Sequence, residues 1–260
     1  MNTDISKNTK RTVSGNERHM MEQQQKEKTL GVLGGLGPMA SVYFYELLTA
    51  HTDASCDQEH INLVLSSHAQ TPDRSDYITG KSRENPLPVM LRDAQKLEAW
   101  GVDMIAIPCN TAHFFYDALQ DACRVPILNI MEENVRYLHS LGVKRAGILA
   151  TDGTVQSGAY DRHMEKYGIT PVVPDAAHQK MLMHIIFDQI KQGVDVDCDL
   201  FAQIASHMKA AGCEKVILGC TELSLIPRSG ETDRFFIDSM EVLVLSVLQK
   251  FGMKIRDFDL

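Results

Sequence analysis

Two cysteines follow apolar runs in closely similar stretches of the sequence. The segment IAIPCNTAHF (105–114) contains Cys109, and the segment VILGCTELSL (216–225) contains Cys220. A thiolate can remove a proton from carbon while an opposed thiol delivers a proton to the other face of the planar intermediate, which inverts a stereocentre by general acid–base catalysis. This chemistry needs neither a cofactor nor a metal, provided that oriented donors hold the carbanionic intermediate.

The residues beside the two cysteines have side chains that are suited to positioning. Asn110, Thr111 and Thr221 are short polar residues that cap helices, and we expect them also to donate hydrogen bonds to a substrate. A single cysteine at a strand end is more often a small buried apolar residue. We assign that structural role to the remaining cysteines of the chain, Cys56, Cys123, Cys198 and Cys213.

The chemistry requires elements that hold both thiols, and the sequence supplies an alternating pattern of strands and helices. Continuous apolar strands separated by amphipathic helices are typical of a parallel sheet with helices on both faces, the α/β class. The strands are predicted at 29–35, 61–67, 104–109, 125–130, 145–151, 170–174, 215–220 and 234–238, and helical patterns occupy 39–49, 88–100 and 200–211.

The two halves of the chain follow one plan. GVLGGLG (31–37) aligns with GILATDG (147–153), the two cysteine segments align with each other, and NIME (129–132) aligns with DSME (238–241), at offsets of 116, 111 and 109 residues. One supersecondary unit used twice explains these ordered anchors. The sequence therefore predicts two pseudo-symmetric Rossmann-like α/β domains, with Cys109 and Cys220 at equivalent strand ends.

The repeat also predicts where a ligand binds. In open α/β sheets ligands bind beyond the carboxyl ends of the strands. Each cysteine is expected to open a helix, whose N–H groups stabilise a thiolate or a bound carboxylate. The predicted site is a cleft between the domains, with one thiol on each wall.

The domain limits follow from the same pattern. The first domain is predicted to comprise 29–133 and about 240–260, and the second to comprise 134–239. Residues 1–28 are polar, mixed in charge and without a periodic apolar face, so they are predicted to form a disordered leader.

Composition excludes several other classes of protein. The 260 residues have a net charge of −8, which disfavours binding to nucleic acid or to an anionic membrane. The apolar runs fall far short of the roughly 20 residues of a membrane span. Six cysteines without a signal peptide, and without Cys-x-x-Cys or His-x-x-x-His spacing, favour reduced thiols in the cytoplasm and no structural metal.

Six segments, in order, resemble the aspartate/glutamate racemase family, and its aspartate racemase branch, which is independent of pyridoxal phosphate, is the most similar. The resemblance runs from about Leu30 to the C-terminus and rests on GVLGGLGPMAS, TPDRSDYITGK, PCNTAHFFYDAL, GILATDGTVQSGAY, HQKMLMHIIF and LGCTELSLI. It implies two pseudo-symmetric α/β domains with the site between them. It also implies a cofactor-independent racemase of an acidic amino acid that is commonly a homodimer.

The resemblance further implies roles for individual residues. Cys109 and Cys220 would be the two acid/base residues, while Arg74 and Lys180 would bind substrate carboxylates. A guanidinium offers the planar pair of donors that a carboxylate matches. The remaining residues of the implied pocket are Leu36, Asn110, Thr111, Thr151 and Thr221. Glu222 is expected to orient the helix of the second thiol or its neighbours and to carry no chemistry itself.

Differences between this sequence and related proteins leave the substrate and the function open. The resemblance is weaker to glutamate racemases, which have an Asp-Ser-Gly motif at the first loop and a Cys-Thr-His motif at the second cysteine. This chain has Gly34–Pro38 and Cys220-Thr221-Glu222 at these positions. That difference favours aspartate without excluding glutamate. GLGPMA (35–40) also fits a dinucleotide-binding loop, but Pro38 removes an N–H that a phosphate would use. A non-catalytic protein that binds acidic metabolites is a further alternative, although binding needs no thiols.

Overall fold

The structure is a computed structural model that describes residues 28–226 and 234–256. It contains two four-stranded parallel sheets with the same strand order, β2-β1-β3-β4 and β6-β5-β7-β8. The predicted α/β class and the predicted repeat are therefore confirmed. The strands are β1 (Thr29–Gly34), β2 (Asn62–Ser67), β3 (Met104–Ala106), β4 (Ile127–Leu128), β5 (Arg145–Leu149), β6 (Thr170–Val172), β7 (Lys215–Leu218) and β8 (Phe236–Asp238). The predicted leader, apart from Lys28, lies outside the described residues.

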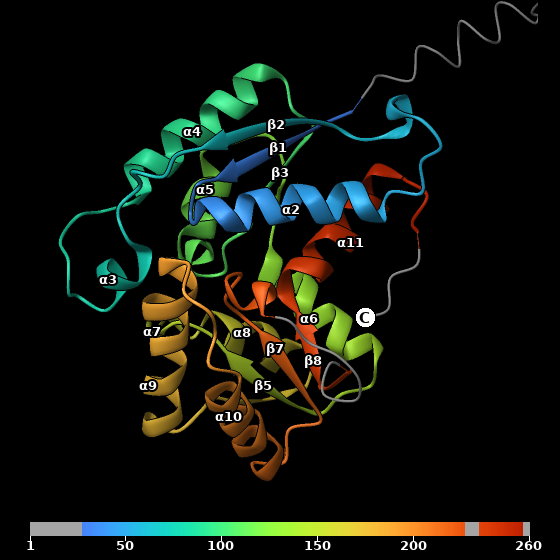
Figure 1. Ribbon diagram of the computed structural model, residues 1–260. Coiled ribbons are helices and arrows are strands. Elements are labelled where there is room, and N and C mark those ends of the chain that lie inside the picture. Colours follow the sequence, from blue (N-terminus) through green and yellow to red (C-terminus); the bar gives the residue numbers. More distant parts are fainter. Residues whose placement is uncertain (1–27, 227–233, 257–260) are drawn as a thin grey trace, which may run out of the picture.

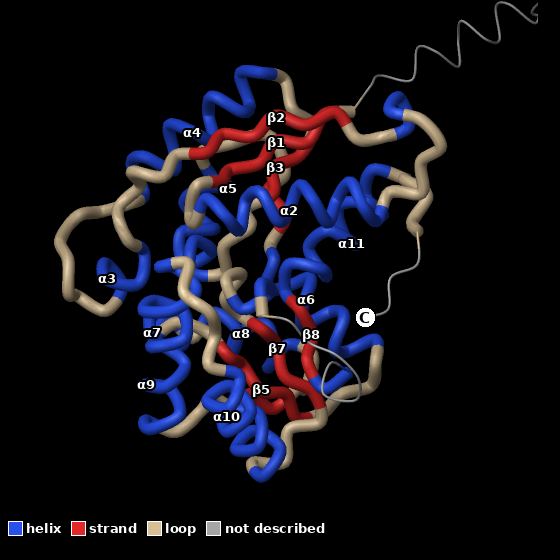
Figure 2. Tube along the Cα trace, viewed as in Figure 1, coloured by secondary structure: helices blue, strands red, loops and turns tan. Residues whose placement is uncertain are grey.

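Helices cover both faces of each sheet (Figures 1 and 2). They are α2 (Pro38–His51), α3 (Arg74–Ile78), α4 (Leu87–Trp100), α5 (Tyr116–Asp121), α6 (Ile130–Ser140), α7 (Asp152–Ser157), α8 (Ala159–Lys166), α9 (Ala176–His184), α10 (Cys198–Ala210) and α11 (Ser239–Phe251). Short 3-10 turns occupy η1 (Asp57–Glu59), η2 (Thr111–Phe115), η4 (Ile190–Gln192) and η5 (Leu223–Leu225), and η3 (Ile185–Gln189) is a π-helical turn. None of the helices in the described ranges is long and apolar enough to cross a membrane.

Alternation along the strands divides the interior into three cores. In β1, Leu30 and Val32 face a central core shared with α2, α6 and α11, whereas Leu33 faces a core under α4 and α5. In the second sheet Ile148 faces the central core and Leu149 faces a core under α9 and α10. Since successive side chains of a strand point to opposite faces, each sheet is buried on both sides.

The central core joins the two halves of the molecule. Helices α6 and α11 pack against each other and contribute apolar side chains to this core, between the two sheets (Figure 1). They begin at the third anchor of the repeat: Asn129 caps α6 by accepting from the backbone N–H groups of Met131 and Glu132, and Asp238 caps α11 in the same way through Met240. The domain limits near 133 and 240 stay a prediction.

The repeat also fixes the positions of the two cysteines. Cys109 follows β3 and Cys220 follows β7, which are the third strands in order along each sheet. The segment after each cysteine differs from the expected α-helix, because a 3-10 turn follows in both places, η2 and η5. After Cys109, η2 runs directly into α5, whereas η5 after Cys220 is a single short turn with fewer aligned peptide dipoles.

Candidate active site

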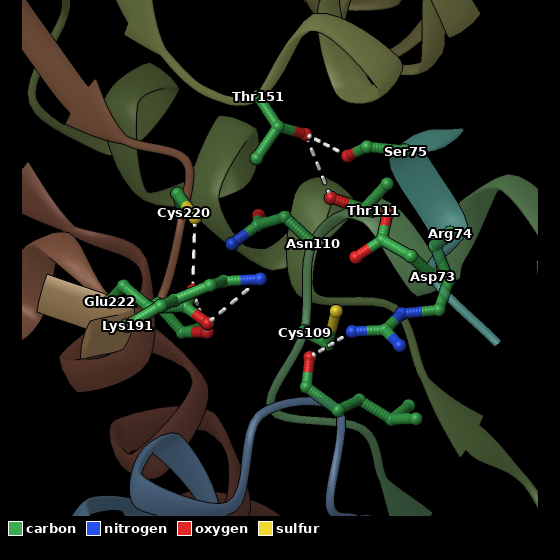
Figure 3. Close-up of a pocket in the computed structure, with 12 residues that line it drawn as sticks. Asp73, Arg74, Ser75, Cys109, Asn110, Thr111, Thr151, Lys191, Cys220 and Glu222 are labelled. Atoms are coloured by element: carbon green, nitrogen blue, oxygen red, sulfur yellow. Dashed lines mark hydrogen bonds and ion pairs between the residues drawn. The ribbon is translucent and has the colours of Figure 1, made fainter. Parts of the chain in front are cut away.

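One pocket brings together residues from both halves of the chain (Figure 3). Its cavity volume is about 10 Å³, room for roughly one water molecule. Eight of the nine residues predicted for the site line it: Leu36, Arg74, Cys109, Asn110, Thr111, Thr151, Cys220 and Thr221. Asp73, Ser75, Lys191 and Glu222 complete the lining. The two thiols come from equivalent strands of opposite sheets, as a two-walled cleft requires.

The first wall combines a buried thiol with a buried guanidinium. Cys109 and Arg74 are 6% and 7% exposed. Burial raises the pKa of the Cys109 thiol, and the nearby Arg74 charge opposes that rise. Arg74 therefore favours the thiolate form of Cys109 relative to a buried cysteine without a cation.

Backbone carbonyls hold Arg74 in place. Its Nη2 donates to the Leu36 carbonyl at 2.7 Å, and its Nη1 donates to the carbonyls of Thr71 and Pro72 at 3.3 and 3.2 Å. Gly35 has a φ of +81°, and a side chain there would collide with the backbone of His68. This turn leaves the Leu36 carbonyl available to accept from Arg74. The glycine-rich loop thus supports Arg74, whose buried Nε has no partner.

The second wall surrounds Cys220 with two charges of opposite sign. The Cys220 Sγ donates to Glu222 Oε2 at 3.0 Å, and Lys191 Nζ lies 3.6 Å from Glu222 Oε1. Burial, followed by the Glu222 carboxylate, raises the pKa of Cys220 well above its ordinary value. Burial alone would lower the pKa of Lys191, but Glu222 and the thiols raise it. Cys220 is therefore protonated and Lys191 is charged.

Hydroxyl groups connect the two halves above the thiols. Thr151, the cap of α7, lies 3.0 Å from the Thr111 hydroxyl and accepts from the Ser75 hydroxyl at 2.9 Å. Thr154 lies 2.9 Å from the Thr111 hydroxyl and 3.2 Å from that of Thr151. Since these groups can reverse donor and acceptor roles, they can adapt to a bound anion.

Asn110 is fixed by partners outside the pocket. Its Oδ1 accepts from the Tyr160 hydroxyl at 2.6 Å, and its Nδ2 donates to the Ser239 Oγ at 3.0 Å. Thr221, on the opposite wall, donates to the Pro108 carbonyl at 3.3 Å and so ties the second cysteine loop to the first. Both residues hold the loops, and Asn110 keeps a second Nδ2 hydrogen for a ligand.

The predicted Lys180 does not line this pocket. It lies exposed on α9, and Lys191 of η4 occupies the pocket instead. The π-helical turn η3 and the turn η4 continue α9 and bring the chain back toward the cleft. The HQK segment contains a lysine at a motif position, whereas nothing local marks Lys191. Asp73 has a local signal, since it precedes Arg74 and caps α3 by accepting from the Asp76 N–H.

Residues 33–247 match the sequence model of the Asp/Glu/Hydantoin racemase family, so the chain belongs to this family of racemases. The family resemblance noted in the sequence is confirmed. Among characterised relatives, the Bacillus subtilis broad specificity amino-acid racemase RacX is 27% identical over 232 residues, which are 85% of this chain and 97% of that protein.

Solved structures of similar fold agree with this assignment. The Picrophilus torridus aspartate racemase has a TM-score of 0.76 and 30% identity, with 88% of this chain and 96% of that chain covered. The glutamate racemase of Francisella tularensis, in complex with D-glutamate, has a TM-score of 0.59 at 20% identity, over 87% of this chain and 82% of that one. The second likeness shows the shared fold alone.

Proposed function

We propose that this protein interconverts L- and D-aspartate without a cofactor, with Cys109 and Cys220 as opposed acid and base. The observation that carries the proposal is the pair of thiols at equivalent strand ends that line one pocket. Membership of a racemase family supports the reaction class. An aspartate racemase among the similar structures supports the substrate.

The charges of the pocket support an acidic amino acid. Arg74 and Lys191 are two cations on different walls, and a dicarboxylate has two anionic groups to pair with them. Asp73 and Glu222 are suited to the substrate ammonium group. Aspartate is the first substrate to test, and glutamate, one methylene longer, is the second.

The reaction begins with the thiol that can more readily lose its proton. Cys109 has the positive charge of Arg74 beside it, whereas Cys220 donates its proton to Glu222. Cys109 first loses its thiol proton to solvent. Its thiolate then accepts the proton from Cα of one enantiomer, and the electron pair left behind is delocalised into the α-carboxylate. Cys220 then donates its proton to the opposite face, so the product leaves Cys109 as a thiol and Cys220 as a thiolate.

Donors in the pocket can stabilise the intermediate. The extra charge on the α-carboxylate needs N–H and O–H groups that are already oriented, and Arg74, Asn110 and Thr111 can supply them. After release, Lys191 offsets the charge of the Cys220 thiolate beside Glu222. The reverse reaction uses the same groups with the roles of the thiols exchanged.

The experiment is chiral chromatography of purified protein with L-aspartate and L-glutamate separately, in D₂O with a reductant and without added cofactor. We expect the D enantiomer with deuterium at Cα, and faster conversion of aspartate. Cys109→Ser and Cys220→Ser should each abolish racemisation, although either variant can still exchange the proton on one face.

Matched controls use the buried cysteines outside the pocket, Cys123 and Cys213. Serine at those positions should leave racemisation at the wild-type rate. Racemisation at the wild-type rate in both pocket variants would refute the two-thiol mechanism. Binding of aspartate by folded wild-type protein without exchange at Cα would instead indicate a binding protein.

A further inference from the structure

A second cluster of reactive side chains lies at the junction of α9 and α10, away from the racemase pocket. Asp175 precedes α9, His178 lies in its first turn, and His207 lies in the last turn of α10. One ligand atom from each residue lies within 4.8 Å of the other two. We propose that these three side chains bind a divalent transition metal ion of the zinc class.

The distances fit a tetrahedral ion after small adjustments. Zinc–nitrogen bonds of about 2.0–2.1 Å and tetrahedral angles separate neighbouring ligand atoms by roughly 3.3 Å. His178 Nδ1 lies 2.7 Å from Asp175 Oδ1, and His207 Nδ1 lies 3.8 Å from Asp175 Oδ2. All three ligand atoms lie within 4.8 Å of one another, so shifts of up to about 1.5 Å bring the carboxylate and the rings to bonding distance.

The two imidazole rings need one rotation. They stack with centroids 4.0 Å apart and 14° between their planes. A metal must lie in the plane of each ring that binds it, so one ring has to turn about its Cβ–Cγ bond. Both side chains are about one-quarter exposed, 24% for His178 and 25% for His207, which leaves room for that turn. Rotation about this terminal torsion is soft.

The carboxylate has one oxygen left for a metal. Asp175 Oδ1 caps α9 by accepting from the backbone N–H groups of Ala177 and His178. Its Oδ2 faces His207 and can bind an ion without loss of the cap. Asp199 and Gln203 line the same surface groove as the two histidines. The fourth ligand would be water, because Asp199 lies about two helical turns from His207 on α10, which gives an open site with nitrogen and oxygen ligands.

The metal would tie α9 to α10. Figure 1 shows these helices side by side at the edge of the second sheet. Gln179, the residue after His178, donates to the Ala150 carbonyl and to Asp152 Oδ1, on either side of Thr151. A bound ion would thus stiffen the helix that supports the Thr151 loop, while no residue of the cluster lines the racemase pocket.

The test is a titration of metal-free full-length protein with Co²⁺, followed by visible absorption, and with Zn²⁺, followed by calorimetry. We expect one equivalent to give d–d bands without the near-ultraviolet charge-transfer band of a cobalt thiolate. His178→Ala and His207→Ala should each weaken Zn²⁺ binding by at least about 10-fold. Asp175→Asn keeps a capping oxygen and should also weaken binding.

His184→Ala is the matched control, because His184 pairs with Asp188 on the continuation of the same helix and has no third ligand among residues 28–226 and 234–256. It should bind Zn²⁺ as the wild type does. Wild-type affinity in the His178→Ala/His207→Ala double variant, or a thiolate band in the wild type, would overturn the proposal. Circular dichroism with a chelator present checks that the variants fold. Racemase activity is measured separately, so this site and the proposed function can fail independently.

Discussion

Cys109 and Cys220 occupy equivalent positions in the repeat but have different charged neighbours. Arg74 lies near Cys109, whereas Glu222 accepts the proton of Cys220 and is itself paired with Lys191. The topology is symmetric, and the electrostatics are not. Because the carboxylate opposes formation of a second negative charge on sulfur, Cys220 should hold its proton to higher pH than Cys109.

Replacement of Glu222 by glutamine tests this difference. Glu222→Gln removes the charge that raises the pKa of Cys220, so that pKa should fall and the thiolate should become more abundant at neutral pH. We expect faster alkylation of Cys220 by iodoacetamide, measured by peptide mass spectrometry. The alkaline loss of kcat/KM, which requires Cys220 to be protonated, should begin at lower pH. Unchanged alkylation and pH profile would contradict this role, and Glu132→Gln on α6 is the control.

Lys191 and Lys180 should differ in their effect on substrate binding. Lys191→Ala removes a pocket cation and leaves Glu222 without its ion pair, so the KM for aspartate should rise by at least about tenfold. Lys180→Ala removes an exposed side chain of α9 and should leave both kcat and KM unchanged. Steady-state kinetics with both enantiomers measures the effect. A larger effect at Lys180 would restore the role first predicted from the sequence.

Helices α3 and α7 come from different halves of the chain and meet over the pocket. A Cβ added at Gly153 would lie 2.7 Å from the Ser75 Cα, which is backbone and cannot turn aside. Glycine at 153 thus allows the approach that brings the Ser75 hydroxyl to Thr151. The packing of α3 against α7 therefore sets how closely the two halves approach each other.

Gly153→Ala should push α3 and α7 apart. We expect a loss of roughly 1–3 kcal/mol in the free energy of unfolding from overpacking, together with a higher KM because Arg74 begins α3. Chemical denaturation and steady-state kinetics measure the two effects. Gln156→Ala, on the exposed side of α7, is the control and should change neither. Greater stability in Gly153→Ala, as helix propensity alone would give, would contradict the contact.

Over the whole molecule, burial gives the stability a definite dependence on pH. Burial raises the pKa of Cys109, Cys220 and Tyr160. The folded state therefore retains protons that the unfolded state loses above a thiol pKa of about 8.5. The stability from these groups is fully present below that pH, and it falls as pH rises toward the folded-state values.

Calorimetry between pH 7 and 10 tests this dependence. The Tm should be nearly constant up to about pH 8 and then decrease. A Cys109→Ser/Cys220→Ser variant should show a shallower decrease, because serine does not titrate in this range. The control, Cys56→Ser/Cys198→Ser, changes two exposed cysteines and should keep the wild-type slope. Equal slopes in both double variants would exclude the pocket thiols as a cause.

The local sequence predicts the strands, several helices and the equivalent positions of the two cysteines. All eight strands lie within the predicted apolar runs, and the helices at 39–49, 88–100 and 200–211 occur within a few residues of the expected limits. A strand that is buried on both faces is apolar at consecutive positions, so it can be recognised from the sequence alone. The repeat placed Cys109 and Cys220 at equivalent ends, because parallel strands present their carboxyl ends at one edge.

Which other side chains meet depends on how the helices pack in three dimensions. Lys191 enters the pocket and Lys180 does not, since a π-helical turn and a 3-10 turn set the direction of the chain after α9. The cysteines open 3-10 turns, where a helix was expected. His178 and His207 have no metal-binding spacing in the sequence and become neighbours only where α9 packs on α10. Such contacts depend on the rotation and packing of whole helices, which residue patterns along a single segment do not specify.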